Sequence, residues 1–174
     1  ASHVGDLVTR LALSHPEVSF RFINNGQVKL HTSGNGNLKD VIYHIYGREI
    51  ASNLIEVDFE RKGIHITGYL GKPLISRGNR NFENYFVDGR YIKSSIISKA
   101  IEDGYKDFTM QHKYPFVVLY LDVDTEHVDV NVHPTKMDVR FNNQQEIYNT
   151  LFAAVDDGLH ERELIPEVTL DDIK

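Results

Sequence analysis

Residues 115–123, PFVVLYLDV, form a nearly unbroken run of β-branched, aliphatic and aromatic side chains. A strand with one solvated face alternates apolar and polar residues, and this run does not alternate. It therefore predicts the central strand of a sheet, covered on both faces. The next segment, residues 126–132, alternates with Val128, Val130 and Val132 on one side, which predicts a strand paired beside the first.

Three β-hairpins are predicted from alternating segments that flank turn residues. The first covers residues 18–32 around Asn25-Gly26, the second covers 54–70 around a turn at 61–63, and the third covers 82–92 around Asp88-Gly89. Asn-Gly and Asp-Gly dipeptides accept the positive φ angles that tight hairpin turns need.

Apolar residues at helical spacing predict four helices between these strands. The first carries Val4, Leu7, Val8 and Leu11 and ends at His15-Pro16, and the second runs from near Asn37 to Gly47. A third follows a cap at Ser94 or Ser95, and a long last helix is capped by Asn142. Helices mixed with hairpin-linked strands predict an α+β fold, a layered mixed sheet packed by helices.

Composition limits the class of protein. The 174 residues suffice for one full domain and a fragment of another, and the absence of cysteine excludes disulfides and thiolate metal sites. No apolar run approaches the roughly 20 residues that span a bilayer. The lack of cysteine fits a reducing cytoplasm, so we expect a cytoplasmic protein without a membrane partner.

The net charge of −6 hides an uneven distribution. Residues 72–99 hold six basic side chains against two acidic ones, whereas residues 156–174 hold seven acidic against two basic. The basic segment is either a solvated loop and helix face or a surface for a nucleic-acid backbone. The candidate DNA-binding residues are Arg77, Arg80, Arg90, Lys93 and Lys99.

A His-Pro corner after the predicted central strands offers a second candidate site. Pro134 lacks an N–H and interrupts the strand pattern, so Lys136 follows on a stiff turn, where its ammonium suits a phosphate group. An ordinary exposed lysine is the alternative. The polar residues of 127–133, including His133, alternate as the solvent face of a strand does, so we predict no metal site. The GNGN stretch at 34–37 lacks the lysine of a phosphate loop and is interpreted as a linker.

Three stretches resemble the MutL family of DNA mismatch repair proteins. They are VDVNVHPTKMDVRF (128–141), YFVDGRYIKSSIISKAIEDGY (85–105) and RLALSHPEVSFRFINNGQ (10–27). The family usually has Asn where this chain has Asp88, and Glu where it has Asp138. Both departures are mild, because Asp also serves a tight turn and a carboxylate is kept at 138.

The resemblance implies a fragment of a longer protein. Residues 1–35 would be the end of an N-terminal ATPase domain, 36–163 the family's second, ribosomal-protein-like (transducer) domain, and 164–174 an acidic linker. In the family, the lysine of the His-Pro motif reaches the γ-phosphate of ATP bound in the first domain, and by that match Lys136 is the residue here. The fragment alone would not be an enzyme. The transducer domain of a type II topoisomerase is the alternative, although the Gln-Thr-Lys motif expected there is absent.

The resemblance also implies cofactors and partners. ATP and Mg would bind the full-length protein, and none is expected on this fragment. DNA, the mismatch-recognition protein MutS and a second copy of the full-length protein would be partners, in a bacterial cytoplasm near the nucleoid. Residues 1–35, away from their parent sheet, are expected to pack against another copy or to be poorly ordered.

Overall fold

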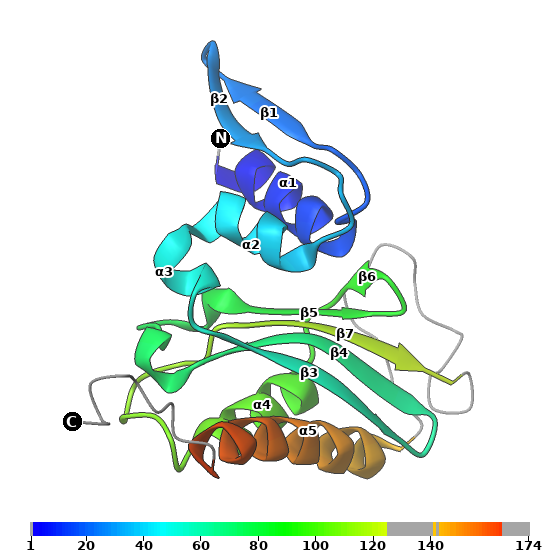
Figure 1. The fold of residues 1–174 in the computed structure, drawn as a ribbon. Helices are drawn as coiled ribbons and strands as arrows, with labels where there is room; N and C mark the ends of the chain where they lie inside the picture. The colour runs from blue at the N-terminus through cyan, green and yellow to red at the C-terminus, as the bar shows by residue number, and fades with distance from the viewer. Residues whose placement is uncertain (1, 125–140, 142, 165–174) are drawn as a thin grey trace, which may run out of the picture.

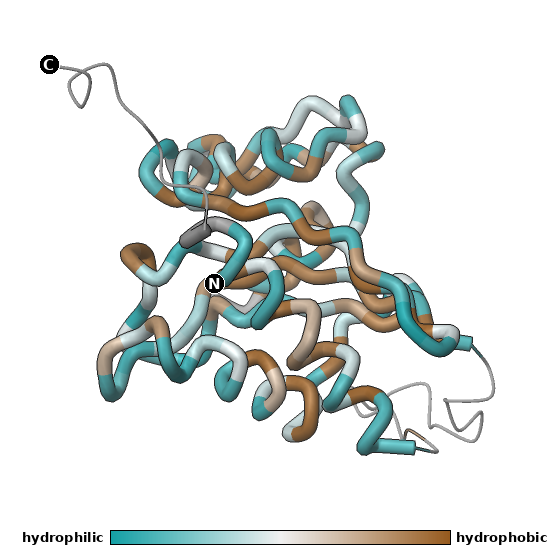
Figure 2. The backbone as a smooth tube through the Cα atoms, turned by 60° about the horizontal axis from the view of Figure 1, so that its bottom comes forward, coloured by the Kyte–Doolittle hydropathy of each residue, from teal (hydrophilic) through white to brown (hydrophobic). Residues whose placement is uncertain are grey.

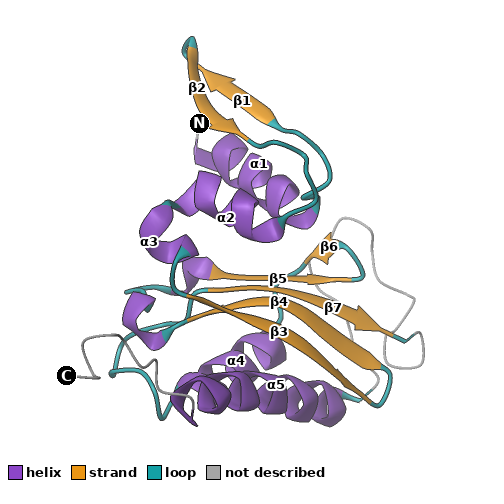
Figure 3. Ribbon diagram, in the orientation of Figure 1, coloured by secondary structure: helices purple, strands orange, loops and turns teal. Residues whose placement is uncertain are grey.

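The computed structural model describes residues 2–124, 141 and 143–164, which form an α+β domain built around one sheet. Its elements are α1 (Ser2–Ser14), β1 (Arg21–Asn24), β2 (Gln27–His31), α2 (Leu38–Tyr46), α3 (Arg48–Ala51), β3 (Leu54–Arg61), β4 (Ile64–Gly71), η1 (Pro73–Ile75), η2 (Arg80–Phe82), β5 (Glu83–Val87), β6 (Arg90–Tyr91), α4 (Ser95–Tyr105), β7 (Val117–Val123) and α5 (Gln144–Leu164). Figure 3 shows them by type.

Strand β7 lies at the centre of the sheet, as its sequence predicts. The order is β3-β4-β7-β5-β6, with β7 antiparallel to β4 and parallel to β5. Helices cover both faces in Figure 1, with α1 and α2 on one side and α4 and α5 on the other. Figure 2 shows hydrophobic residues along the central strands. The predicted mixed sheet between helical layers is confirmed.

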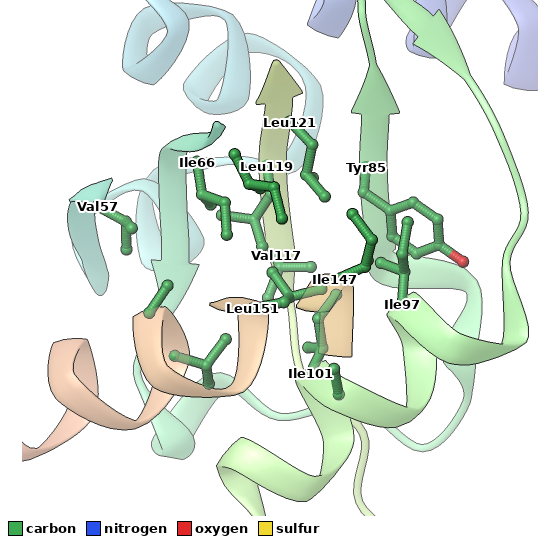
Figure 4. Close-up of a cluster of buried hydrophobic side chains, with 14 of the residues drawn as sticks. Val57, Ile66, Tyr85, Ile97, Ile101, Val117, Leu119, Leu121, Ile147 and Leu151 are labelled. Carbon is green, nitrogen blue, oxygen red and sulfur yellow. The ribbon is translucent and has the colours of Figure 1, made fainter. Parts of the chain in front are cut away.

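The face toward α4 and α5 carries the larger core, which we call the lower core. It joins Leu119 and Leu121 of β7 to Ile97 and Ile101 of α4 and to the apolar stripe of α5 (Figure 4). The two helices approach closely at Gly104, where an added Cβ would lie 2.6 Å from a methyl carbon of Val155. Close contact of this kind leaves no room for a larger residue at 104.

The opposite face carries a second cluster, which we call the upper core. Ala12 and Leu13 of α1, and Val41 and Ile42 of α2, pack over Val118, and over further sheet residues that include Phe86. Tyr120 of β7 donates a hydrogen bond through its hydroxyl to the backbone oxygen of Leu13. The N-terminal segment therefore has a partner within the chain along one side of α1.

The same segment leaves other apolar side chains uncovered. Val4 and Leu7 of α1, together with Ile23 and Val28 of the first hairpin, are each at least half exposed. The expectation that residues 1–35 pack against another copy or are poorly ordered stays a prediction. Among the described residues, no helix is long and apolar enough to cross a membrane.

The local turns follow the sequence closely. Asn25, Lys62 and Asp88 adopt φ angles of 52°, 50° and 49°, each followed by a glycine with positive φ. Asn37 caps α2 and Ser94 caps α4. These features confirm the three hairpins and the starts of two helices.

Other predictions need correction or lie outside the described residues. The predicted cap of the last helix is wrong by one position, because the side chain of Asn143 accepts the backbone N–H of Glu146, at 3.2 Å. The predicted cap, Asn142, is also an asparagine, so composition alone cannot distinguish the two. Helix α3 and the 3₁₀ turns η1 and η2 are not predicted by the sequence pattern. The strand predicted at 126–132 lies outside the described residues.

Candidate functional site

The candidate residues His133, Pro134 and Lys136 lie outside the described residues. The described chain on either side of that segment belongs to one core. Val123, at the end of β7, and Phe141 are each only 7% exposed and both pack in the lower core. The described residues on both sides of the segment that carries Lys136 therefore belong to the same core.

Asp88, in the turn between β5 and β6, is tied to the start of that segment. Its carboxylate Oδ1 accepts the backbone N–H of Val123 at 3.0 Å, and its own N–H donates to the carbonyl of Leu121 at 2.9 Å. Asp and Asn both tolerate the positive φ of this position, and both offer an acceptor oxygen. The turn thus fastens the end of the central strand.

Replacing Asp88 by alanine should lower the free energy of unfolding by about 1–2 kcal/mol, because the Val123 amide loses its acceptor and alanine is strained at positive φ. Asp88→Asn should stay within about 0.5 kcal/mol of the wild type, since its side-chain oxygen replaces the carboxylate oxygen. Urea unfolding of the 174-residue chain measures both. Equal losses in the two variants would contradict this role.

The five predicted DNA-binding residues differ in their exposure. Arg77 is half-buried in an isolated bridge with Tyr114, and its guanidinium carbon lies 5.3 Å from the ring centre of Phe82. Its Nε is buried without a hydrogen-bond partner among the described residues. Arg77 therefore supports the loop rather than presenting a free charge.

The other four residues are exposed, and two of them, Arg80 and Lys93, line a pocket beside the β5–β6 edge of the sheet. Arg90 lies in β6, Lys93 follows it, and Lys99 is on the outer side of α4. Arg80, in η2, donates from Nε to Glu102 Oε1 at 2.6 Å. That hydrogen bond raises the pKa of Arg80 and offsets part of its charge.

A pocket of about 290 Å³ lies at this edge, and we call it the edge pocket. Among the residues that the structure describes, β6 pairs only with Phe86 and Val87, so there the first residues of β5 have a strand neighbour on one side only. The edge pocket occupies this position. The lining includes Arg10, Arg80, Glu83, Tyr91, Lys93 and Ser98.

Two residues of the edge pocket are not identified by the sequence pattern. Arg10 comes from α1, and its guanidinium carbon lies 4.2 Å from the ring centre of Tyr91, a cation–π contact. Glu83 begins β5 and is 8% exposed. The sequence signal for Glu83 is a charged residue beside an apolar strand pattern, whereas nothing local marks Arg10.

Glu83 has an unusual electrostatic environment. Burial raises its pKa to about 8, the charge of Glu102 acts in the same direction, and Arg80 opposes the shift. Both carboxyl oxygens are buried and have no hydrogen-bond partner among the described residues. Near neutral pH the side chain is therefore mainly a neutral acid, with one O–H donor and a free acceptor.

Hydrogen bonds fix the start of α4 against the edge pocket. The Tyr85 hydroxyl donates to the Ser94 carbonyl at 3.0 Å, accepts the Ser94 N–H at 2.9 Å, and lies 2.8 Å from Ser98 Oγ. Ser94 in turn accepts the backbone N–H of Ile97 at 3.4 Å. The positive end of the α4 dipole is thereby held at the pocket.

No site for a metal ion is evident in the part of the chain that the structure describes. There, no three His, Asp or Glu side chains gather closely enough to hold one. The prediction that the polar residues of 127–133 bind no metal concerns residues outside the described part of the chain.

Comparison with known proteins gives a consistent picture. A family model described as "DNA mismatch repair protein, C-terminal domain" matches residues 42–160. The chain is 59% identical to the DNA mismatch repair protein MutL of Agathobacter rectalis over 98% of its own length and 26% of that protein. It is 43% identical to MutL of Clostridium botulinum over 92% of its length and 24% of that protein.

Solved structures agree in fold. "Crystal Structure of N terminal domain of a DNA repair protein" matches with a TM-score of 0.77 and 21% identity, over 94% of this chain and 54% of that one. "Aquifex aeolicus MutL ATPase domain complexed with ADP" matches with a TM-score of 0.54 and 15% identity, over 86% of this chain and 46% of that one. The chain spans about a quarter of the length of the two curated MutL relatives named above.

Proposed function

This chain belongs to the MutL family of DNA mismatch repair proteins, and from that premise we propose that it couples ATP state to domain arrangement in a longer mismatch-repair ATPase. Membership excludes the topoisomerase alternative. The observation that carries the proposal is that Val123 and Phe141, which stand on either side of residues 125–140 in the sequence, both pack in the lower core. A cation on the segment between them can transmit a contact to the whole sheet.

In this proposal Lys136 contacts the γ-phosphate of ATP bound in a preceding domain. ATP and Mg belong to the longer protein, and the 174-residue chain is not an enzyme by itself. When hydrolysis removes the γ-phosphate, the lysine no longer has its partner and the two domains can shift. The test compares ATP turnover by the longer protein with turnover by its Lys136→Ala and Lys136→Arg variants.

We further propose that the longer protein acts in the bacterial cytoplasm near the nucleoid, as a homodimer that works with MutS on DNA. The observation that favours DNA contact is the exposure of several cations, namely Arg90 in β6, Lys93 just after it, and Lys99 on α4. Backbone phosphates would meet these charges without base-specific reading. Arg77 is removed from this set because its guanidinium packs on Phe82.

Reversing the charges of Arg90 and Lys99 should weaken binding to a duplex of arbitrary sequence by about tenfold at 0.1 M salt. The slope of log affinity against log salt should fall by about one for each phosphate that the variant fails to neutralise. Fluorescence anisotropy at several salt concentrations measures both. Lys113→Glu, on an exposed lysine of another loop, is the control, and an equal weakening there would contradict a localised surface.

A further inference from the structure

We propose that the edge pocket binds a phosphomonoester group, carried either by the end of a nucleic-acid strand or by a free small molecule. The inference is independent of the coupling role of Lys136 and concerns a different group from the backbone diesters of DNA. Three observations support it: the positive charge of the pocket, the buried carboxyl group of Glu83, and the N-terminus of α4 beside the pocket.

The first argument is the balance of charge. Arg10 and Lys93 each bring one positive charge to the pocket, while Arg80 is paired with Glu102 at 2.6 Å. With Glu83 neutral, the net charge is about +2 near pH 7. A phosphomonoester carries up to two negative charges there and neutralises this excess, whereas a backbone diester carries one.

Glu83 supplies the second argument. A buried carboxyl group with no partner is costly unless a ligand satisfies it, and both of its oxygens lack a partner among the described residues. As a neutral acid it donates one hydrogen bond to a phosphate oxygen. A cationic ligand would also satisfy an ionised Glu83, but Arg10 and Lys93 would repel it.

The third argument is the start of α4. Ser94, Ser95 and Ser98 line the pocket, and the helix has 11 residues, enough for a positive N-terminal end. Hydroxyl groups and helix N-termini are common partners of phosphate groups. The volume of about 290 Å³ is near the lower limit of small-ligand pockets, which fits a group rather than a large molecule.

Calorimetry of the 174-residue chain with inorganic phosphate tests the proposal. Lys93→Met should weaken binding by about tenfold, because it removes a charge-assisted hydrogen bond. Lys113→Met, on an exposed lysine that does not line the pocket, should bind as the wild type does. Thermal unfolding of each variant, without phosphate, shows whether the fold is kept.

The pH dependence gives a second readout. A phosphomonoester gains a proton below pH about 6, and Glu83 loses one above about 8, so affinity for the 5′-phosphorylated trinucleotide described below should be greatest between these values. The groups that influence Glu83 are Arg80 of η2, Glu102 of α4 and the phenol groups of Tyr85 and Tyr105. Affinity at pH 9 should be about tenfold below that at pH 7, and Glu83→Gln should remove this alkaline weakening.

Two trinucleotides of the same sequence, one with a 5′-phosphate and one with a 5′-hydroxyl, distinguish a strand end from a free small molecule as the carrier of the phosphomonoester. A preference for the phosphorylated strand supports a strand end as the ligand. Equal, weak binding of both, beside clear binding of inorganic phosphate, supports a free phosphomonoester. Absence of phosphate binding between pH 6 and 8 by a folded chain would overturn the proposal, as would equal affinity in wild type and Lys93→Met.

Discussion

Replacing Lys136 by alanine in the longer protein is expected to lower ATP turnover by about 100-fold, the usual effect of removing one preorganised group that stabilises transition-state charge. The γ-phosphate would lose the lysine cation that contacts it. The domain movement that follows hydrolysis would then no longer depend on whether the γ-phosphate is present. Affinity for ADP should stay within about twofold, because ADP has no γ-phosphate. Steady-state turnover and ADP titration measure the two quantities.

The variant Lys136→Arg keeps the charge but changes the shape and reach of the cation, so it should retain part of the turnover. Lys113→Ala, on an exposed lysine, should leave turnover unchanged. Unchanged turnover in Lys136→Ala would contradict the coupling role. A fall in turnover accompanied by an equal fall in ADP affinity would point to damaged folding instead.

Replacing Gly68 by alanine is expected to destabilise the chain by at least about 3 kcal/mol, a large part of a typical domain stability of about 5–15 kcal/mol. Gly68 lies in β4 with φ of +123°, and an added Cβ would lie 2.1 Å from the carbonyl oxygen of Val118. Relief requires β4 and β7 to separate, which breaks the centre of the sheet. Urea unfolding measures the decrease in stability.

Gly5→Ala is the matched control. Gly5 lies within α1, where an added Cβ would meet nothing within 4 Å. Alanine favours the helix over glycine by about 0.5–1 kcal/mol, so this variant should be slightly more stable than the wild type. Comparable destabilisation in both variants would mean that the contact with Val118 is not the cause.

The sequence predicts those features that neighbouring residues determine. Asn25 and Asp88 mark their turns because few residues other than glycine adopt positive φ. The central position of β7 follows from residues 117–121, whose side chains are aliphatic or aromatic on both faces. The predicted cap of α5 is wrong by one residue because Asn142 and Asn143 have the same capping chemistry.

The edge pocket could not be predicted in the same way. Arg10 is far from Lys93 in the sequence, and they share the pocket because α1 packs over the sheet near β6. The raised pKa of Glu83 depends on burial at the start of β5 and on the charge of Glu102 in another element. Such properties belong to the assembled tertiary structure, and a pattern along the chain does not contain them.

The use of β7 by both cores has a consequence for how this protein can be divided. Leu119 faces the lower core and Val118 faces the upper core, which contains Leu13 and Leu30 of the first 35 residues. A shortened protein that began at residue 36 would keep α2 over this face but would lose the cover that Ala12, Leu13 and Leu30 give to the upper core. Such a truncation would produce an aggregation-prone protein. The sequence motifs on either side of residue 36 nevertheless suggest a domain boundary there.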